Sequence, residues 1–252
     1  MPISAAILAG GLGTRLRPVL SDRPKVLAPT AGRPFLDYVL HYLSSQGIQK
    51  VVLCVGYLAS QVAAFAADGS RWNLQIHFSQ EDIPLGTAGA LKLALGSLQG
   101  PFFALNGDTL FTANLQELWQ AHLAANAWGT LALRQVLDAS GRGCVTLNSA
   151  GMIVSFDEKP EGSLVSPQPL LINSGVYLLT PQTVADLPDD RATSLEREVF
   201  PRLAALGRLA GCIQSGYFVD IGTPDSLAAF EQDVRSGVIS SALPGESRAR
   251  TK

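Results

Sequence analysis

The first half of the chain alternates short apolar runs with segments whose apolar residues recur at a helical period. The apolar runs are continuous enough to predict strands buried on both faces, and they cover residues 3–9, 51–55, 74–78 and 102–105. The helical segments cover residues 34–46, 58–67, 87–97 and 114–126. Strands that alternate with helices favour right-handed crossovers, and therefore an α/β fold with a mostly parallel sheet.

Beyond residue 128 the strand-like runs follow one another with short turns, which predicts an antiparallel or mixed section at residues 129–134, 143–147, 152–156 and 171–179. A helix is expected at residues 193–206 and a strand at residues 209–219. Thr223 and Pro224 are the residue types of an N-cap and a first helical position, so a last helix is predicted to begin there.

These elements predict a single domain over residues 1–236. We assign its first half, residues 1–128, to nucleotide binding and expect its second half, residues 129–236, to complete the site. The remaining residues, 237–252, are turn-forming or charged and show no period, so we expect this tail to fray.

Composition narrows the class of protein. Hydrophobic residues make up 47% of the chain and charged residues 16%, which is typical of a globular protein with a core. The formal net charge of −2 argues against nucleic acid as a partner. No apolar run approaches the roughly 20 residues of a membrane span. The opening MPISAAILAGG lacks a basic region, so we expect a buried strand rather than a signal peptide.

The cysteines and histidines predict neither disulfides nor zinc. Cys54, Cys144 and Cys212 are widely spaced and set among apolar residues, which predicts buried free thiols in core strands. The three histidines form no ligand-spaced cluster in the sequence. Both observations fit a protein of the reducing cytoplasm.

A glycine-rich stretch, AAILAGGLGTRLRP, follows the first predicted strand. It therefore lies at the carboxyl end of a parallel strand, where ligands bind in open α/β sheets. A dinucleotide fingerprint would need glycine where the chain has Leu16, and the spacing of a P-loop does not occur. Gly10, Gly11 and Gly13 nevertheless allow the close backbone approach of an anion nest. Arg15 and Lys25 add a planar guanidinium and a point charge, so the stretch predicts a phosphate site.

Two carboxylates predict a metal beside that phosphate site. Asp108, in LNGDTLF, ends a strand at the same sheet edge, where a carboxylate is unfavourable beside phosphate unless a cation lies between them. Mg²⁺ is the natural candidate, because it is held by one or two carboxylates together with phosphates. Asp220, in GYFVDIGTPDS, lies in an apolar strand, where a carboxylate is costly unless it is paired or metal-bound.

Three further stretches carry weaker signals. EDIPLGTAGAL places Gly86, Thr87 and Gly89 at a helix start, where backbone N–H groups can reach a base or a phosphate. FDEKP supplies Glu158 beside Lys159. INSGVYLL interrupts a strand at Asn173, where a ligand hydroxyl can approach the backbone.

Taken in order, these motifs resemble the sugar-1-phosphate nucleotidylyltransferase family over about residues 3–234: LAGGLGTRLRP with RPK, PLGTAGAL, NGD, EKP, NSGVY and DIGTP. The resemblance implies a three-layer, Rossmann-like nucleotide-diphospho-sugar transferase fold, with helices on both faces of a mixed, mostly parallel sheet. It implies an enzyme that uses Mg²⁺ to join a nucleoside triphosphate and a sugar 1-phosphate. Composition, charge and cysteine pattern add the expectation of a cytoplasmic protein with neither nucleic acid nor membrane as a partner.

The same resemblance implies roles for individual residues. Catalytic roles fall to Arg15, Lys25 and Asp108, and metal binding to Asp108 and Asp220. Nucleotide contacts are implied at Leu8, Gly10, Gly11, Gly13, Thr14, Arg15, Glu81, Gly86 and Thr87. Sugar-phosphate contacts are implied at Gly143, Glu158, Lys159 and Asn173.

Several functions stay open at this point. Within the family, EDIPLGTAGAL, NGDTLF, SLEREVFPRL and GYFVDIGTPDS most resemble the D-glycero-D-manno-heptose 1-phosphate guanylyltransferases. Mannose-1-phosphate guanylyltransferase and glucose-1-phosphate thymidylyl- or uridylyltransferase are the alternatives, and a catalytically silent regulatory subunit of the same fold is another. A nicotinamide dehydrogenase is disfavoured by Leu16. The oligomeric state is open.

Overall fold

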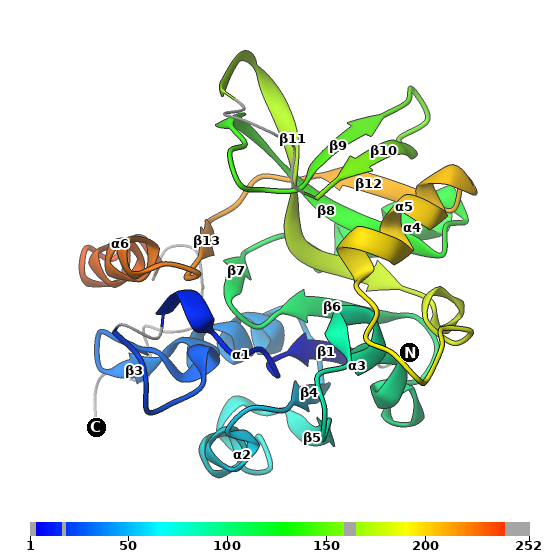
Figure 1. Ribbon diagram of the computed structural model, residues 1–252. Coiled ribbons are helices and arrows are strands. Elements are labelled where there is room, and N and C mark those ends of the chain that lie inside the picture. The colour runs from blue at the N-terminus through cyan, green and yellow to red at the C-terminus, as the bar shows by residue number, and fades with distance from the viewer. Residues whose placement is uncertain (1–3, 17–18, 159–164, 240–252) are drawn as a thin grey trace. The chain divides into compact units, whose positions relative to one another are not determined.

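The computed structural model describes residues 4–16, 19–158 and 165–239 (Figure 1). The chain divides into two compact units. The first unit comprises Met1–Pro84, Leu105–Thr112 and Gly216–Lys252, and the second comprises Leu85–Ala104 and Ala113–Ser215. These bounds differ from the two consecutive halves expected from the sequence, since two later segments join the first unit. Much of the tail expected to fray, from residue 240 onward, lies outside the described residues.

Parallel strands form the centre of the first unit. Strand β1 (Ser4–Leu8) pairs with β4 (Lys50–Val55), and β4 pairs with β5 (Gln75–Gln80), each in parallel (Figure 1). Ala5, Ala6 and Ile7 are fully buried in succession, which is why this strand is a continuous apolar run. In β5, by contrast, Phe78 remains 39% exposed. The α/β class and the predicted parallel strands are confirmed.

The described part of the first unit contains the α-helices α1 (Phe35–Ser45), α2 (Ala59–Ala66) and α6 (Pro224–Arg235). The last begins as predicted, because the Thr223 side chain accepts from the Ser226 backbone N–H and Ser226 returns a bond to Thr223 in a capping box. Phe230 of α6 is fully buried, with its ring centroid 5.1 Å from that of Phe35 and 5.2 Å from that of Tyr38. This aromatic group fixes α6 against α1.

The strand expected at residues 209–219 is two strands. β12 (Leu209–Ile213) lies in the second unit, and β13 (Phe218–Asp220) pairs antiparallel with β7 (Thr109–Phe111) in the first. Between them the backbone passes so close to Thr112 that a Cβ at Gly216 would lie 2.8 Å from the Thr112 carbonyl oxygen. A chain crossing at this point requires glycine.

The second unit contains the predicted mixed section. Strand β11 (Val165–Leu179) is antiparallel to both β8 (Gly129–Asp138) and β9 (Cys144–Leu147). β9 is antiparallel to β10 (Ile153–Asp157), and β12 is parallel to β8 (Figure 1). Helices α3 (Gly86–Ala94) and α4 (Leu115–Ala125) also belong to this unit.

The helix expected at residues 193–206 changes its geometry partway. A π-helix, Leu195–Val199, precedes the α-helix α5 (Phe200–Ala205). The Val199 N–H donates to the Ser194 carbonyl, five residues back, at 3.2 Å. Pro201 explains the change, since its ring has no N–H and would clash with the carbonyl four residues earlier in a regular helix.

The remaining regular elements are short. Strand β6 (Phe102–Asn106) leads to β7, and β2 (Pro29–Thr30) pairs with β3 (Arg33–Pro34). Turns of 3₁₀-helix occur at Thr14–Leu16, Lys25–Leu27, Ser70–Trp72, Leu95–Ser97 and Pro181–Thr183.

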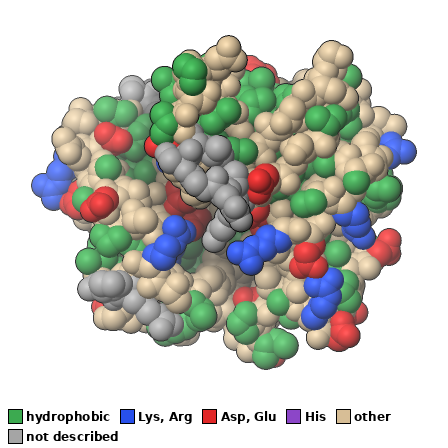
Figure 2. Space-filling model, turned by 45° about the horizontal axis from the view of Figure 1, so that its top comes forward, with side chains coloured by type: hydrophobic (Ala, Val, Ile, Leu, Met, Phe, Trp, Pro, Cys, Tyr) green, Lys and Arg blue, Asp and Glu red, His purple; other side chains and the backbone are tan. Residues whose placement is uncertain are grey.

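All three cysteines are free thiols, but only one is buried as predicted. Burial raises the pKa of the Cys54 thiol to about 12. Cys144 and Cys212 are partly exposed, because β9 and β12 do not bury both faces as β1 and β4 do. None of the described helices is long and apolar enough to cross a bilayer. The face drawn in Figure 2 mixes small groups of basic and acidic side chains, in keeping with the net charge of −2.

We expect Phe230→Ala to destabilise the protein by about 3–5 kcal/mol, because it removes a buried aromatic side chain and leaves a cavity between α6 and α1. Urea unfolding followed by circular dichroism measures the change. Leu123→Ala is a control, since Leu123 is 55% exposed on α4 and its truncation is expected to cost less than about 0.5 kcal/mol. Equal losses in the two variants would contradict this account of α6.

Candidate active site

The glycine loop follows β1 directly and lies against the ends of two neighbouring strands. The Leu8 carbonyl accepts from the Gly107 N–H at 3.0 Å, and the Ala9 N–H donates to the Cys54 carbonyl at 2.8 Å. A Cβ at Gly107 would lie 2.5 Å from the Leu8 oxygen, so this strand end needs glycine for close approach. Gly11, by contrast, has open space around its missing Cβ.

Glu81 packs on the backbone of this loop. A Cβ at Gly10 would lie 2.7 Å from Glu81 Oε1, and one at Gly56 would lie 2.9 Å from the same atom. Gly56 was not predicted as a site residue, although it follows the strand at residues 51–55 just as Gly10 follows β1. The rule that ligands bind beyond the carboxyl ends of strands would have identified it.

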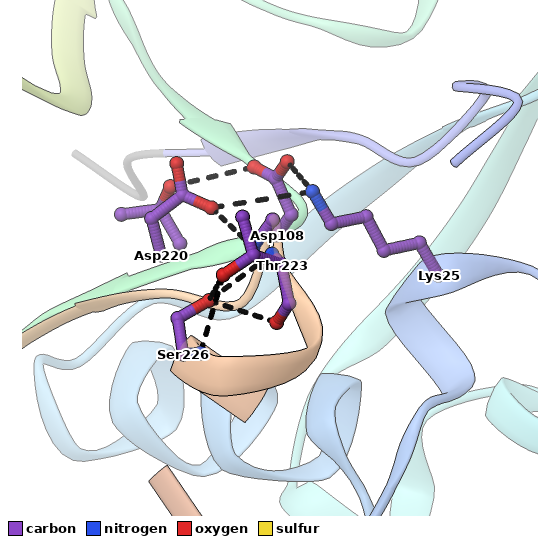
Figure 3. Close-up of polar contacts among 7 residues, drawn as sticks. Lys25, Asp108, Asp220, Thr223 and Ser226 are labelled. Carbon is purple, nitrogen blue, oxygen red and sulfur yellow. Dashed lines mark hydrogen bonds and ion pairs between the residues drawn. The ribbon is translucent and has the colours of Figure 1, made fainter. Parts of the chain in front are cut away.

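Lys25 and two aspartates meet in the first unit. Lys25 Nζ donates to Asp108 Oδ2 and lies 4.0 Å from Asp220 Oδ1 (Figure 3). Gly13 adopts a φ of +57°, and a Cβ there would lie 3.2 Å from the Lys25 Cβ, so glycine lets the lysine stem pass against the loop. The Lys25 side chain is 12% exposed, which leaves its charge poorly hydrated and directed toward the carboxylates.

The pairing of β7 with β13 explains why the two aspartates lie together. Asp220 is the register partner of Thr109, the residue after Asp108. The Ile221 N–H donates to the Asp108 carbonyl at 2.9 Å, which extends the pairing by one residue. Two carboxylates that are far apart in the sequence are therefore held at one point by backbone hydrogen bonds.

The charges at this point are only partly balanced. Burial raises the pKa of Asp220, and the nearby charge of Asp108 raises it further, while Lys25, the Gly222 N–H and Arg15 oppose the shift. The Gly222 N–H donates to Asp220 Oδ1 at 2.6 Å. The net effect is that the ionised form of Asp220 is less favourable here than in water, so additional positive charge would stabilise it.

Arg15 also lies at this site. A Cβ at Gly222 would lie 3.0 Å from Arg15 Nη2, so the guanidinium rests on the Gly222 backbone beside Asp220. Leu16 anchors the turn that carries Arg15, since only 1% of its surface is exposed. Thr14, at the start of the same turn, is exposed. The first unit thus brings together the residues predicted for phosphate and metal binding.

The donor set fits Mg²⁺ better than a metal held by protein alone. Among the described residues, no group of three or more His, Cys, Asp or Glu side chains is arranged to hold an ion. Asp108 and Asp220 form a pair, and Mg²⁺ is commonly bound by one or two carboxylates with substrate phosphates and water as its other ligands. The raised pKa of Asp220 indicates a site that gains from a cation.

In the second unit, three of the four residues predicted to contact the sugar phosphate lie together. The Asn173 N–H donates to the Gly143 carbonyl at 2.8 Å. A Cβ at Gly143 would lie 3.0 Å from Glu158 Oε2 and 3.5 Å from the Asn173 Cβ. Gly175, with a φ of +76°, directs its N–H to Asn173 Oδ1 at 3.1 Å. Lys159 lies outside the described residues.

Backbone N–H groups in the first turn of α3 are hydrogen-bonded to another segment of the same unit. The Ala88 and Gly89 N–H groups both donate to the Thr193 carbonyl, at 2.9 and 3.4 Å. A Cβ at Gly86, whose φ is +75°, would lie 2.5 Å from the same oxygen. The N–H groups of Ala88 and Gly89 are therefore hydrogen-bonded within the protein, although N–H groups at this helix start were expected to bind a ligand. The predicted nucleotide contacts at Gly86 and Thr87 stay predictions.

Parallel strands that end in a glycine loop with adjacent cations are a common framework of nucleotide-binding enzymes. The Nucleotidyl transferase family matches residues 4–237, and the chain belongs to this family.

Two relatives share much of the sequence. A mannose-1-phosphate guanylyltransferase of Mycobacterium tuberculosis is 37% identical over 247 residues, which are 96% of this chain and 68% of the relative. A D-glycero-alpha-D-manno-heptose 1-phosphate guanylyltransferase of Campylobacter jejuni is 36% identical over 231 residues, which are 90% of this chain and 98% of the relative.

A solved structure confirms the fold. The crystal structure of HddC from Yersinia pseudotuberculosis matches with a TM-score of 0.81 and 29% identity, over 92% of this chain and 99% of that one. The same protein complexed with GMP-PN matches with a TM-score of 0.80. The predicted Rossmann-like α/β fold is therefore confirmed.

We expect Asp220→Asn to stabilise the metal-free protein slightly at pH 7, raising Tm by no more than about 2 °C. Folding raises the pKa of Asp220, so its protonated form adds stability that is lost as the pH rises through the folded pKa, and asparagine keeps that form at all pH values. The gain stays small because 43% of the Asp220 side chain is exposed. It should vanish below about pH 4, where the wild-type carboxyl is also protonated.

Thermal unfolding in EDTA across a pH series measures this difference. Asp190→Asn, an exposed carboxylate in a bend outside the helices and strands, is the control and should leave Tm unchanged. A less stable Asp220→Asn variant at pH 7 would mean that attraction to Lys25 and Arg15 outweighs burial and repulsion.

Proposed function

We propose that this protein is a sugar-1-phosphate guanylyltransferase that joins GTP and D-glycero-D-manno-heptose 1-phosphate, releasing pyrophosphate. The proposal rests on the group of Arg15, Lys25, Asp108 and Asp220. Guanine is supported by the names of the relatives and by the GMP-PN complex of HddC. Heptose is supported by the alignment with the Campylobacter jejuni enzyme, which spans 98% of that relative, against 68% for the mannose enzyme.

The proposed reaction requires that the repulsion between two negatively charged substrates be reduced, and it does not require a general base. The attacking phosphate oxygen is already anionic at neutral pH, because the second pKa of a phosphate monoester is about 6. It must approach the α-phosphate of a second polyanion. Arg15 and Lys25 reduce this repulsion by binding triphosphate oxygens, and Arg15 also stabilises the pyrophosphate that leaves.

The two aspartates would hold Mg²⁺. When bound, the ion supplies positive charge to the triphosphate. Asp108 and Asp220 themselves keep Lys25 directed toward the same point. Lys25 therefore has two functions in the proposal, as a counter-charge for the carboxylates and as a ligand for phosphate.

The second unit supplies the sugar contacts in this proposal. Glu158 accepts hydrogen bonds from sugar hydroxyls, and Asn173 contacts the sugar beside the Gly143 backbone. Glycine at position 143 leaves room next to both side chains. Lys159 is expected to bind the phosphate of the sugar.

A matrix of nucleoside triphosphates and sugar 1-phosphates tests the proposal. GTP, dTTP and UTP are each combined with the 1-phosphates of D-glycero-D-manno-heptose, mannose, glucose and N-acetylglucosamine, and pyrophosphate release is measured with Mg²⁺. We expect the highest kcat/KM for GTP with the heptose substrate. A higher value with mannose 1-phosphate would correct the sugar, and a higher value with dTTP or UTP would refute the guanylyl assignment. Nucleotide binding without pyrophosphate release in any combination would indicate a silent subunit.

Asp108→Asn should lower kcat by about 100-fold or more while the fold is retained, because one of two charged oxygen ligands is replaced by a neutral amide. The measurement is pyrophosphate release at saturating substrates, with circular dichroism as the check on folding. Asp225→Asn is the control and should keep wild-type kcat. Full activity of Asp108→Asn would remove the metal site from the mechanism.

A further inference from the structure

Glu196 is a buried carboxylate to which three hydroxyl groups are directed. Only 8% of its surface is exposed. Its Oε2 accepts from Thr87 Oγ1 at 2.8 Å and from Ser194 Oγ at 2.9 Å, and its Oε1 lies 3.5 Å from Tyr177 Oη. Burial of a carboxylate is costly, so these hydrogen bonds are needed to keep it in place.

One arm of this network reaches the predicted sugar site. Tyr177, which is fully buried, accepts from Asn173 Nδ2 at 3.0 Å, so the phenol stands between Asn173 and Glu196. The other Asn173 side-chain atom, Oδ1, accepts from the Gly175 N–H. Both ends of the Asn173 amide are therefore held, and the orientation of the side chain depends on Tyr177.

The other arm reaches the first turn of α3, which carries the predicted nucleotide contacts. Thr87 Oγ1 donates to Glu196 and accepts from the Leu195 N–H at 2.8 Å. Thr193, just before this segment, closes the same turn with its carbonyl. The α3 turn is thus attached to the segment that presents Glu196.

A carboxylate at position 196 also sets the direction of each hydrogen bond. An ionised carboxylate only accepts, so Thr87 and Tyr177 must both donate to it. Their oxygens are then available to accept, from the Leu195 N–H and from Asn173 Nδ2 respectively. An amide at the same position keeps one oxygen, which is uncharged and therefore a weaker acceptor, and presents donors in place of the other, so both chains of bonds are weakened.

The π-helix explains how Glu196 reaches this position. Leu195–Val199 is wider than an α-helix, and the Ser194 side chain caps it by accepting from the Arg197 N–H at 3.2 Å. Single π-turns are rare and occur frequently at functional sites. The neighbouring Glu198 on the same turn pairs with Arg191 and has 39% of its side chain exposed; its Oε1 accepts from the Ser194 N–H at 3.1 Å, a bond that a glutamine oxygen can also accept.

We propose that Glu196 is a positioning residue that links the sugar-binding and nucleotide-binding groups of the second unit. Through Tyr177 it orients Asn173 toward the sugar 1-phosphate, and through Thr87 it holds the first turn of α3. The proposal rests on the proposed function for the identity of the two substrates. The linkage itself rests only on the contacts within the second unit.

Steady-state kinetics of three variants test the two arms. Glu196→Gln should raise the KM for both the sugar 1-phosphate and GTP by about tenfold, with a smaller change in kcat. Tyr177→Phe keeps the ring packed on Phe200, at a centroid distance of 5.0 Å, and should raise the KM for the sugar 1-phosphate only. Thr87→Val should raise the KM for GTP only.

The double variant Glu196→Gln with Tyr177→Phe separates positioning from general damage. If Glu196 acts on the sugar through Tyr177, the double variant has the same KM for the sugar 1-phosphate as either single variant, about tenfold above wild type. Effects that multiply to about a hundredfold would overturn the proposal. So would an unchanged KM in Glu196→Gln, or an equal effect of the matched control Glu198→Gln.

Hydrogen–deuterium exchange tests the linkage without turnover. Glu196→Gln should speed exchange both in peptides covering residues 85–95 and in those covering 170–177, and Glu198→Gln in neither. Unchanged exchange in both regions of Glu196→Gln would refute the linkage. A wild-type protein that releases no pyrophosphate with any substrate pair, yet shows this exchange pattern, would refute the proposed function and leave the linkage standing.

Discussion

Repulsion between two carboxylates is the constraint around which the first unit is organised. Asp108 and Asp220 are brought together by the backbone pairing of β7 with β13, not by any attraction between their side chains. Lys25, Arg15 and the Gly222 N–H reduce the cost of this arrangement, but burial and proximity still raise the pKa of Asp220. A fold that retains this cost has an electrostatic preference for additional cations at one point, which is the basis of the proposed metal role.

The glycines follow from the same constraint, because side chains can gather only where the backbone leaves room. Gly13 admits the stem of Lys25, and Gly222 admits the guanidinium of Arg15. Gly107 lets the turn that carries Asp108 approach β1. Each of these glycines makes room for one charged group of the site, so the glycine content near the strand ends reflects electrostatics as much as chain flexibility.

Local sequence patterns predicted the helices and strands of the first unit, and they also predicted that its charged residues Arg15 and Asp108 lie near one another. Continuous apolar runs identified β1 and β4, and residue types at Thr223 and Pro224 identified the start of α6. The carboxyl ends of parallel strands share one edge of a sheet, and for this reason Arg15 and Asp108 were expected to lie at the same site. These inferences succeeded because they depend on burial, on strand direction and on short-range capping.

What the sequence did not reveal depends on tertiary contacts. The split of residues 209–219 into β12 and β13 depends on the close passage of Gly216 past Thr112, which no local period records. Glu196 occurs in a stretch with an ordinary helical pattern, and its burial depends on the π-turn that Pro201 induces. The hydroxyls that meet it come from α3 and β11, far away in the chain.

The first unit is built from three separate segments of the chain, and this affects the order in which its contacts can form during synthesis. Its glycine loop and Lys25 emerge early during synthesis, whereas Asp220 and α6 belong to the last segment of the unit. Chains fold largely from the N-terminus as they are synthesised, and contacts between distant segments form late. The carboxylate pair can therefore form only after β13 has left the ribosome, and an N-terminal fragment that ends before β13 would contain the phosphate loop without the pair.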